Sequence, residues 1–186
     1  MNAEQFTNLC RKHGACRKGL DWIKGKSLAE FWQTCDRADW MLWIVGRMAG
    51  EKGWPTRQDI VLVACLCAET ALPFFEKKYP KDDRPRNAIE TARAWAKGEC
   101  DIEEVHKARR AAAYAAYAAY AAYAAYAADA AAYAAYAADA AYAAYAADAA
   151  AYAAAYAYAA YADAAARAGA LRKMAGIVRE NLKVPL

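Results

Sequence analysis

The chain has 186 residues, of which 60% are hydrophobic and 25% are charged, so it is long enough to bury the core of one ordinary domain. Its 25 Lys and Arg residues outnumber its 21 Asp and Glu residues, which gives a net charge of +4. This excess is too small and too scattered for the dense basic face of a nucleic-acid-binding protein. We therefore expect no nucleic-acid partner.

The N-terminus and the cysteines indicate a cytoplasmic protein. Residues 1–11 lack the apolar stretch of a secretory signal peptide. We therefore expect the six cysteines to be reduced thiols in the cytoplasm. The long apolar tract in the second half carries four aspartates, and each would cost about 3 kcal/mol at membrane depth. We expect a soluble protein that does not span a membrane.

Capping signals predict the first helices. Ser27 followed by Glu30 forms a capping box, in which each side chain bonds the backbone N–H of the other residue, and it opens a helix over residues 28–35. Asp36 or Asp39 is expected to begin the next helix.

Residues 56–72 predict a third helix that is apolar on every side, and such a helix belongs in the middle of a core. Thr56 is its expected cap, with Asp59 in the first turn. Pro73 is expected to interrupt this helix, and a charged loop over residues 77–85 follows.

Residues 86–97 predict a fourth helix that ends at Gly98, because glycine adopts the backbone conformation that closes a helix. Asp101 and Glu104 begin the helix that continues into the apolar tract. No segment alternates between apolar and polar residues with a period of two, so no strand is predicted. The predicted fold is all-α, a helical bundle.

An alanine-tyrosine tract occupies residues 111–166. Thirteen of the fourteen tyrosines lie between Tyr114 and Tyr161, and alanine, the strongest helix former, fills almost every other position. The tract therefore predicts helix. It has no large aliphatic side chain, so it is not expected to form a core of its own.

These patterns divide the chain into three predicted parts. Residues 1–110 form a Trp-rich helical domain, residues 111–170 form the alanine-tyrosine helical tract, and residues 171–186 form a C-terminal helix that packs back on the first part.

The tyrosine spacing decides how the tract can pack. An α-helix turns by about 100° per residue, so each three-residue step falls about 60° short of a full turn. From Tyr114 to Asp129 the side chains therefore move about 300° around the helix, in a spiral rather than a stripe. A long two-stranded coiled coil is excluded, because its apolar side chains recur every 3.5 residues on average. Either several shorter helices pack on different sides, or one long helix carries an exposed ladder of phenol rings.

An exposed tyrosine surface would suit protein recognition, because tyrosine offers a large contact area and a hydroxyl at little cost in entropy. Two alternatives remain: the tract is a helical layer docked on the core, or its tyrosines meet those of a second copy of the chain. The candidate binding residues are Tyr114, Tyr117, Tyr120, Tyr123, Tyr126, Tyr133, Tyr136, Tyr142, Tyr145 and Tyr152.

Cys10, His13 and Cys16 bring three metal-ligating side chains within seven residues. A fourth ligand could come from Cys35, Cys65 or Cys67. The paired Cys-x₂-Cys knuckles of structural zinc sites are absent, however. We expect no metal, and these three residues are the candidate ligands if one binds.

No catalytic motif stands out. Gly25-Lys26-Ser27 resembles the end of a phosphate-binding loop, but the nearest upstream glycine is one residue too far away and no predicted strand precedes it. Trp40, Trp43 and Arg47 would share one helix face at a spacing typical of a core. We interpret the tryptophans as core residues, and we expect a non-enzymatic protein without a cofactor.

Three stretches of the sequence, residues 34–43, 84–98 and 173–182, resemble the immunity proteins of the immunity-protein-5-like family. Alanine- and tyrosine-rich tracts between the last two stretches are also typical of that family, and the resemblance extends from about Gly19 to Leu182. It implies a bacterial protein that binds and neutralises a toxin, and it brings no catalytic residues. Immunity proteins against nucleases are often acidic, so the charge of +4 does not favour a nuclease as the toxin.

Overall fold

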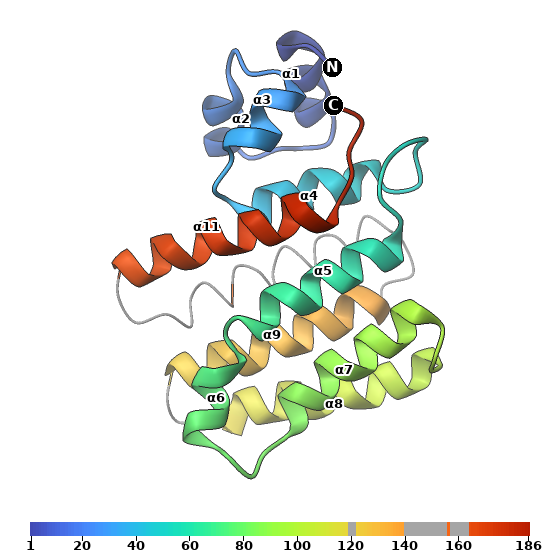
Figure 1. Ribbon diagram of the computed structural model, residues 1–186, viewed down its shortest axis with the longest axis vertical. Helices are drawn as coiled ribbons and strands as arrows, with labels where there is room; N and C mark the ends of the chain where they lie inside the picture. The colour runs from blue at the N-terminus through green and yellow to red at the C-terminus, as the bar shows by residue number, and fades with distance from the viewer. Residues whose placement is uncertain (119–121, 140–155, 157–163) are drawn as a thin grey trace.

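The computed structural model describes residues 1–118, 122–139, 156 and 164–186. Within these residues all regular structure is helical, which confirms the predicted all-α fold. Figure 1 shows the helices stacked in layers, with the first three helices and both chain termini at one end of the molecule.

Three short helices form this end: α1 (Ala3–Lys12), α2 (Arg17–Ile23) and α3 (Leu28–Thr34). A capping box begins α1, because the Asn2 side chain accepts from the backbone N–H of Gln5 at 3.0 Å and the Gln5 side chain accepts in return at 3.1 Å. No helix is predicted before residue 28, so the sequence patterns missed α1 and α2.

The predicted caps of two helices are present. The Ser27 side chain accepts from the backbone N–H of Glu30 at 3.2 Å, and the Glu30 carboxylate accepts from the backbone N–H of Ser27 at 2.7 Å. Thr56 and Asp59 bond each other in the same way at the start of α5 (Arg57–Glu69). Local side-chain chemistry therefore sets where α3 and α5 begin.

The predicted start of the next helix is wrong. Helix α4 (Ala38–Met48) begins after Arg37, and no side chain caps it. The Asp39 carboxylate instead accepts from the Arg37 guanidinium at 2.9 and 2.5 Å. An ion pair between neighbouring residues has taken the place of the expected aspartate cap.

Helix α5 lies at the centre of the core, but it ends at Glu69, three residues before the predicted end. Helix α6 (Leu72–Lys78) follows, with Pro73 in its first turn, where the missing N–H leaves no helical bond unmade. Pro73 therefore helps to begin a helix rather than to interrupt one. Among the described helices, none is long and apolar enough by itself to cross a membrane. Helices α5 and α6, taken together as a bent pair, have the length and composition of a span, by those two criteria alone.

Helix α7 (Arg84–Lys97) ends at Gly98 as predicted, and Gly98 has a φ of +78°, which glycine adopts without steric cost. It begins two residues earlier than expected, so the charged loop is shorter. Helix α8 (Ile102–Ala118) then begins where Asp101 accepts from the backbone N–H of Glu104 at 2.9 Å.

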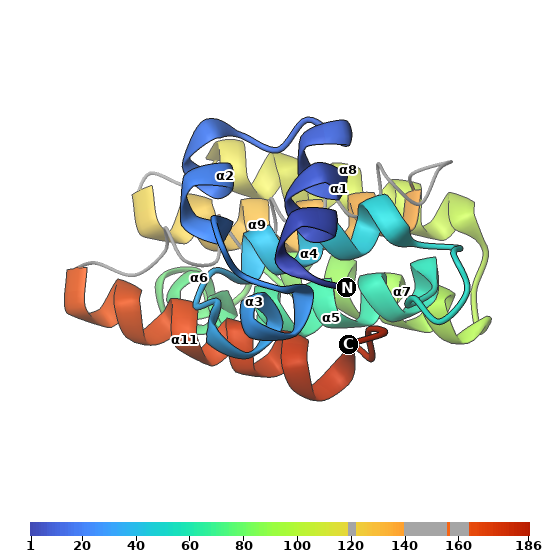
Figure 2. The ribbon, with the colours of Figure 1, turned by 90° about the horizontal axis from the view of Figure 1, so that it is seen from above.

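The alanine-tyrosine tract forms separate helices in the residues that the structure describes. After α8 comes α9 (Ala122–Asp139), which packs mainly on α8 and also contacts α5, α6 and α7. Figures 1 and 2 show α9 lying beside α8, between it and α5. Of the two alternatives left by the tyrosine spacing, the described residues take the one with several shorter helices.

Alanines form the buried face of α9. Tyr126, Asp129, Tyr133 and Tyr136 are separated by steps of three, four and three residues, so together they cover only about 80° of the helix. The other side of the helix is buried. Its buried residues are Ala127, Ala130, Ala131, Ala132, Ala134, Ala135 and Ala137. Because methyl side chains allow close backbone approach, α9 can contact four neighbouring helices at once.

The last helix, α11 (Ala164–Asn181), lies across α4 and α5 and buries Met174, Ala175 and Val178. Its Arg179 donates from Nε to the backbone oxygen of Trp32 at 2.7 Å, and from a terminal nitrogen to the backbone oxygen of Cys35. This contact ties the end of α3 to the rest of the molecule. The three-part division at residues 110 and 170 stays a prediction, and both boundaries fall inside continuous helices.

Candidate functional site: a tyrosine surface on helix α8

Two of the predicted binding residues, Tyr114 and Tyr117, stand exposed on α8. The exposed fraction is 69% for Tyr114 and 93% for Tyr117. With Arg110 and Ala113 they line a shallow hollow of about 380 Å³. We call these four residues the α8 surface.

The sequence of α8 explains why these side chains point outward. The helix buries Val105, Ala108, Ala112, Ala115 and Ala116. At about 100° per residue these five residues lie within a 100° arc, and the four residues of the α8 surface lie within another such arc on the opposite side. The alanines face α7 and α9, so the tyrosines face solvent.

Arg110 is the cation of the α8 surface. A terminal nitrogen of Arg110 lies 3.8 Å from a carboxylate oxygen of Glu103, and both side chains are more than half exposed. An exposed pair at this distance contributes little to stability, so it leaves the Arg110 side chain available to a partner. Arg110 was not among the predicted binding residues, although its position four residues before Tyr114 places it on the same helix face.

The described tyrosines of α9 are engaged within the molecule. Tyr133 stacks on Tyr156 with ring centroids 5.1 Å apart and planes 13° apart, and Tyr126 lies 6.1 Å from the same ring. The guanidinium of Arg109 lies over the Tyr136 ring at 4.9 Å and links α8 to α9. These rings contribute to packing more than to an open surface.

The other predicted binding residues are not described. Tyr120, Tyr142, Tyr145 and Tyr152 lie outside the described residues, and Tyr123 belongs to α9 but its side chain is not described. The full set of ten tyrosines therefore stays a prediction. Of the five that the structure describes, Tyr114 and Tyr117 are the most exposed.

The candidate metal ligands do not form a cluster. Among the described residues, which include Cys10, His13 and Cys16, no group of three or more His, Cys, Asp or Glu side chains is placed to hold a metal ion. Cys10 is buried, and burial raises the pKa of its thiol to about 11. Cys16 is exposed, and its sulfur accepts from the backbone N–H of Gly19 at 3.4 Å, so it caps α2.

Three further cysteines are packing residues of the core. Cys35, Cys65 and Cys67 are fully buried, and burial raises the pKa of each thiol, to about 11 for Cys35 and about 12 for the other two. A thiol with such a pKa stays protonated at neutral pH and is a poor nucleophile or metal ligand.

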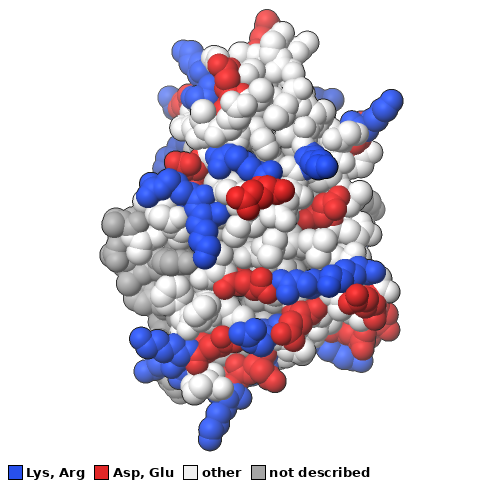
Figure 3. All heavy atoms as spheres, viewed as in Figure 1, with Lys and Arg blue, Asp and Glu red and all other residues white. Residues whose placement is uncertain are grey.

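Charges are mixed on the face of the molecule shown in Figure 3. Among the described residues of that face, Lys and Arg side chains alternate with Asp and Glu side chains over the lower helices, without a broad area of one sign.

The class of protein follows from comparison of this all-helical chain with known families. A family model described as "Imm-5 like putative immunity protein" matches residues 55–178, about two thirds of the chain. The chain belongs to this family. The matched range runs from the start of α5 to near the end of α11 and includes the whole α8 surface. Neither the comparison with curated proteins nor the comparison with solved structures found a match.

Proposed function

We propose that this chain is a non-enzymatic immunity protein that binds and neutralises a bacterial toxin, and that the toxin docks on the α8 surface. The observation that supports this most is the exposure of Tyr114 and Tyr117 within the range that matches the family. Tyrosine and arginine are enriched among the residues that dominate binding energy in protein interfaces, and the α8 surface supplies both.

The α8 surface is held in place before a partner arrives. Alanines on the other side of α8 pack on α7 and α9, and the Arg109 guanidinium lies over the Tyr136 ring. Little backbone motion is then needed on binding, so little conformational entropy is lost. Each exposed ring has only two side-chain torsions to fix.

The charge of the chain narrows the class of toxin. A nuclease presents a basic face to its substrate, and an immunity protein that covers such a face is usually acidic. The net charge of +4 and the cation at Arg110 favour a toxin whose docking patch is neutral or acidic.

The experiment is co-expression of this chain with a candidate toxin from a neighbouring gene. The native chain is expected to restore growth and to co-purify with the toxin. The double variant Tyr114→Ala and Tyr117→Ala is expected to weaken binding about 100-fold or more, since two central anchor residues are removed. Phe74→Ala is the matched control, because Phe74 is an exposed aromatic residue on α6 and lies outside the α8 surface. A native chain that gives neither rescue nor a complex would overturn the proposal.

Self-association is the alternative function, in which the α8 surfaces of two copies meet. The exposed pair Tyr114 and Tyr117 favours it, because stacked or edge-on phenol rings from two copies would be mutually complementary. Light scattering at high protein concentration distinguishes self-association from the proposed toxin binding. A monomer removes the alternative, and a dimer that the double tyrosine variant dissociates supports it.

A further inference from the structure

The positive charge of the chain is concentrated at its N-terminal end. Residues 1–26 contain six Lys and Arg residues and only two Asp and Glu residues, an excess of four. The remaining 160 residues contain 19 residues of each sign, so this short segment accounts for the whole net charge of +4. Figure 1 shows the segment, with α1 and α2, at the opposite end of the molecule from α8.

Four cations of this segment lie on either side of the loop between α1 and α2. Two are the last residues of α1, two are the first residues of α2, and all four side chains are exposed. Four cations are too few for a nucleic-acid-binding face but suit a local acidic patch on a partner. We call them the loop cations: Arg11, Lys12, Arg17 and Lys18.

The loop cations are weakly paired within the molecule. Nε of Arg17 lies 3.9 Å from a carboxylate oxygen of Asp21, and the exposed fractions of the two side chains are 96% and 73%. Such an exposed pair contributes little to stability. Lys12 and Lys18 form no ion pair with the residues that the structure describes. These charges are therefore available to a partner.

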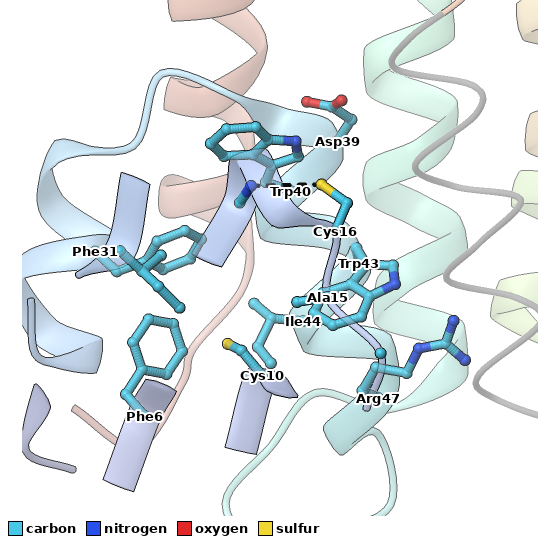
Figure 4. Close-up of a pocket in the computed structure, with 13 residues that line it drawn as sticks. Phe6, Cys10, Ala15, Cys16, Phe31, Asp39, Trp40, Trp43, Ile44 and Arg47 are labelled. Carbon is cyan, nitrogen blue, oxygen red and sulfur yellow. Dashed lines mark hydrogen bonds between the residues drawn. The ribbon is translucent and has the colours of Figure 1, made fainter. Parts of the chain in front are cut away.

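The loop between the cations also forms one edge of an aromatic cleft. Gly14, Ala15 and Cys16 line this cleft, whose volume is about 450 Å³, which is ample for one or two side chains. Figure 4 shows Ala15 and Cys16 together with the aromatic walls. The apolar side chains that line the cleft are Phe6, Ile23, Phe31, Trp40, Trp43 and Ile44.

Ring contacts fix the walls of the cleft before a partner arrives. The Phe31 ring lies 5.2 Å from that of Phe6 and 5.9 Å from that of Trp22, and Trp22 lies edge-on to Trp40 at 6.0 Å. Trp40 and Trp43 pack against the core but are only partly buried, so part of their surface stays open. An aromatic side chain placed against them would remove apolar surface of both partners from water.

The two charged side chains of α4 that line the cleft are both engaged within the molecule. The Asp39 carboxylate accepts from two nitrogens of Arg37, which offsets its charge. The Arg47 guanidinium lies over the Trp43 ring at 5.4 Å and has a further partner in the molecule. The positive charge beside the cleft therefore comes from the loop cations.

From this arrangement we infer that the α1–α2 end is a second protein-docking surface, which binds an acidic polypeptide segment that carries an aromatic side chain. The aromatic side chain enters the cleft against Trp40 and Trp43, and the neighbouring carboxylates meet the loop cations. A recessed cleft suits a side chain that projects from a polypeptide better than it suits the flat surface of a membrane. This surface precedes residue 55, where the family match begins, and it does not depend on toxin binding at the α8 surface.

Three short fluorescein-labelled peptides test the inference on the full chain. The first has one phenylalanine between two runs of glutamate. One matched peptide has serine in place of phenylalanine, and the other has glutamine in place of every glutamate. We expect the first peptide to bind with one-to-one stoichiometry at low ionic strength, and each matched peptide to bind about tenfold more weakly, since each loses one part of the contact. Fluorescence anisotropy measures the three affinities.

Charge variants assign the carboxylates to the loop cations. Replacement of all four loop cations should weaken both glutamate peptides about tenfold and leave the glutamine peptide unchanged. The variant carries Arg11→Gln, Lys12→Gln, Arg17→Gln and Lys18→Gln. A control with the same loss of charge at exposed lysines elsewhere should bind all three peptides as the native chain does. The control carries Lys77→Gln, Lys78→Gln, Lys81→Gln and Lys97→Gln.

A variant of Gly19 assigns the phenylalanine to the cleft. Gly19 lines the cleft four residues before Ile23, so a side chain added there lies on the same face of α2. Its Cβ would meet the Cys16 sulfur at 3.5 Å, an ordinary contact, so α2 can accept it. Gly19→Leu should weaken the phenylalanine peptide about tenfold and leave the serine peptide unchanged. Gly19→Ala is the control, and circular dichroism confirms that each variant is folded.

The double variant Tyr114→Ala and Tyr117→Ala should bind all three peptides normally, which separates this surface from the α8 surface. Loss of binding in that variant alone would overturn the inference, as would absence of binding between the native chain and the first peptide. Tighter binding of a single-stranded oligothymidylate or of phosphatidylserine vesicles would overturn the choice of a polypeptide. Unchanged binding in the folded loop-cation variant, or in Gly19→Leu, would overturn the charged or the aromatic part of the contact.

Discussion

Asp129 is an acidic side chain of the alanine-tyrosine tract whose pKa is changed by burial. It lies between Tyr126 and Tyr133 along the polar stripe of α9, and it is half-buried. Burial raises the pKa of its carboxyl above the ordinary value. Folding therefore favours the protonated acid, and the ionised carboxylate opposes folding at neutral pH.

Asp129→Asn is therefore expected to raise the free energy of unfolding at pH 7, by less than about 1 kcal/mol. Above the raised folded-state pKa, the native carboxylate is ionised and burial of its charge lowers the free energy of unfolding by the full amount. The penalty falls as pH drops through that pKa and disappears below the unfolded-state pKa of about 3.9. Urea denaturation of both proteins at pH 7 and at pH 3.5 measures the difference. A gain that is equal at the two pH values would contradict this account.

The helix starts that carry a complete capping box were predicted correctly from the sequence, because such a cap depends on residues three apart in the chain. Ser27 and Thr56 begin helices as expected. The start of α4, which no side chain caps, and the end of α5 were not predicted correctly. In the sequence, Pro73 is equally compatible with the end of one helix and with the start of the next, and the tertiary structure decides between these two positions.

The cap of α5 gives a direct test at this scale. Thr56→Ala is expected to lower the free energy of unfolding by about 1 kcal/mol, since the backbone N–H of Asp59 loses its acceptor. Thr56→Ser keeps the hydroxyl and serves as the control. Thermal or urea unfolding measures both, and equal stability of the alanine and serine variants would contradict the prediction.

The alanine face of α9 gives a second test. Ala134 is fully buried, and Ala134→Leu is expected to lower the free energy of unfolding by about 1–3 kcal/mol, because the added carbons have no space between packed helices. Ala113→Leu is the matched control on α8, where the side chain is exposed and a change within about 0.5 kcal/mol is expected. Similar losses in the two variants would argue against tight packing of α9.

The candidate sites were predicted only in part, and the reason lies at the scale of the whole molecule. The sequence singled out Tyr114 and Tyr117, but their exposure depends on which side of α8 meets α7 and α9. Trp40, Trp43 and Arg47 were placed on one face of α4, and both tryptophans pack against the core as predicted. The same three side chains also line a cleft, whose other walls come from α1 and α2, two helices that the sequence did not predict.

Arg179 on α11 bonds the end of α3, so its loss should destabilise residues that are far from it in the sequence. Arg179→Met removes the donors that bond the backbone oxygens of Trp32 and Cys35, which leaves the end of α3 unsatisfied. We expect a loss of about 2 kcal/mol in the free energy of unfolding. Faster amide hydrogen exchange is expected in residues 28–35. Arg172→Met, an exposed change on the same helix, is the control and should leave exchange unchanged.

The alanine face of α9 has one more consequence, which concerns register. A helix whose contacts are almost all methyl groups could slide past its neighbours by one turn, about 5.4 Å, and still place methyl against methyl. The larger side chains must therefore select one register among several of similar packing energy. Arg109 over Tyr136 and Tyr133 against Tyr156 are the contacts placed to do so. The tyrosine contacts on the outer stripe of α9, rather than its buried alanines, therefore fix the position of the helix along its axis.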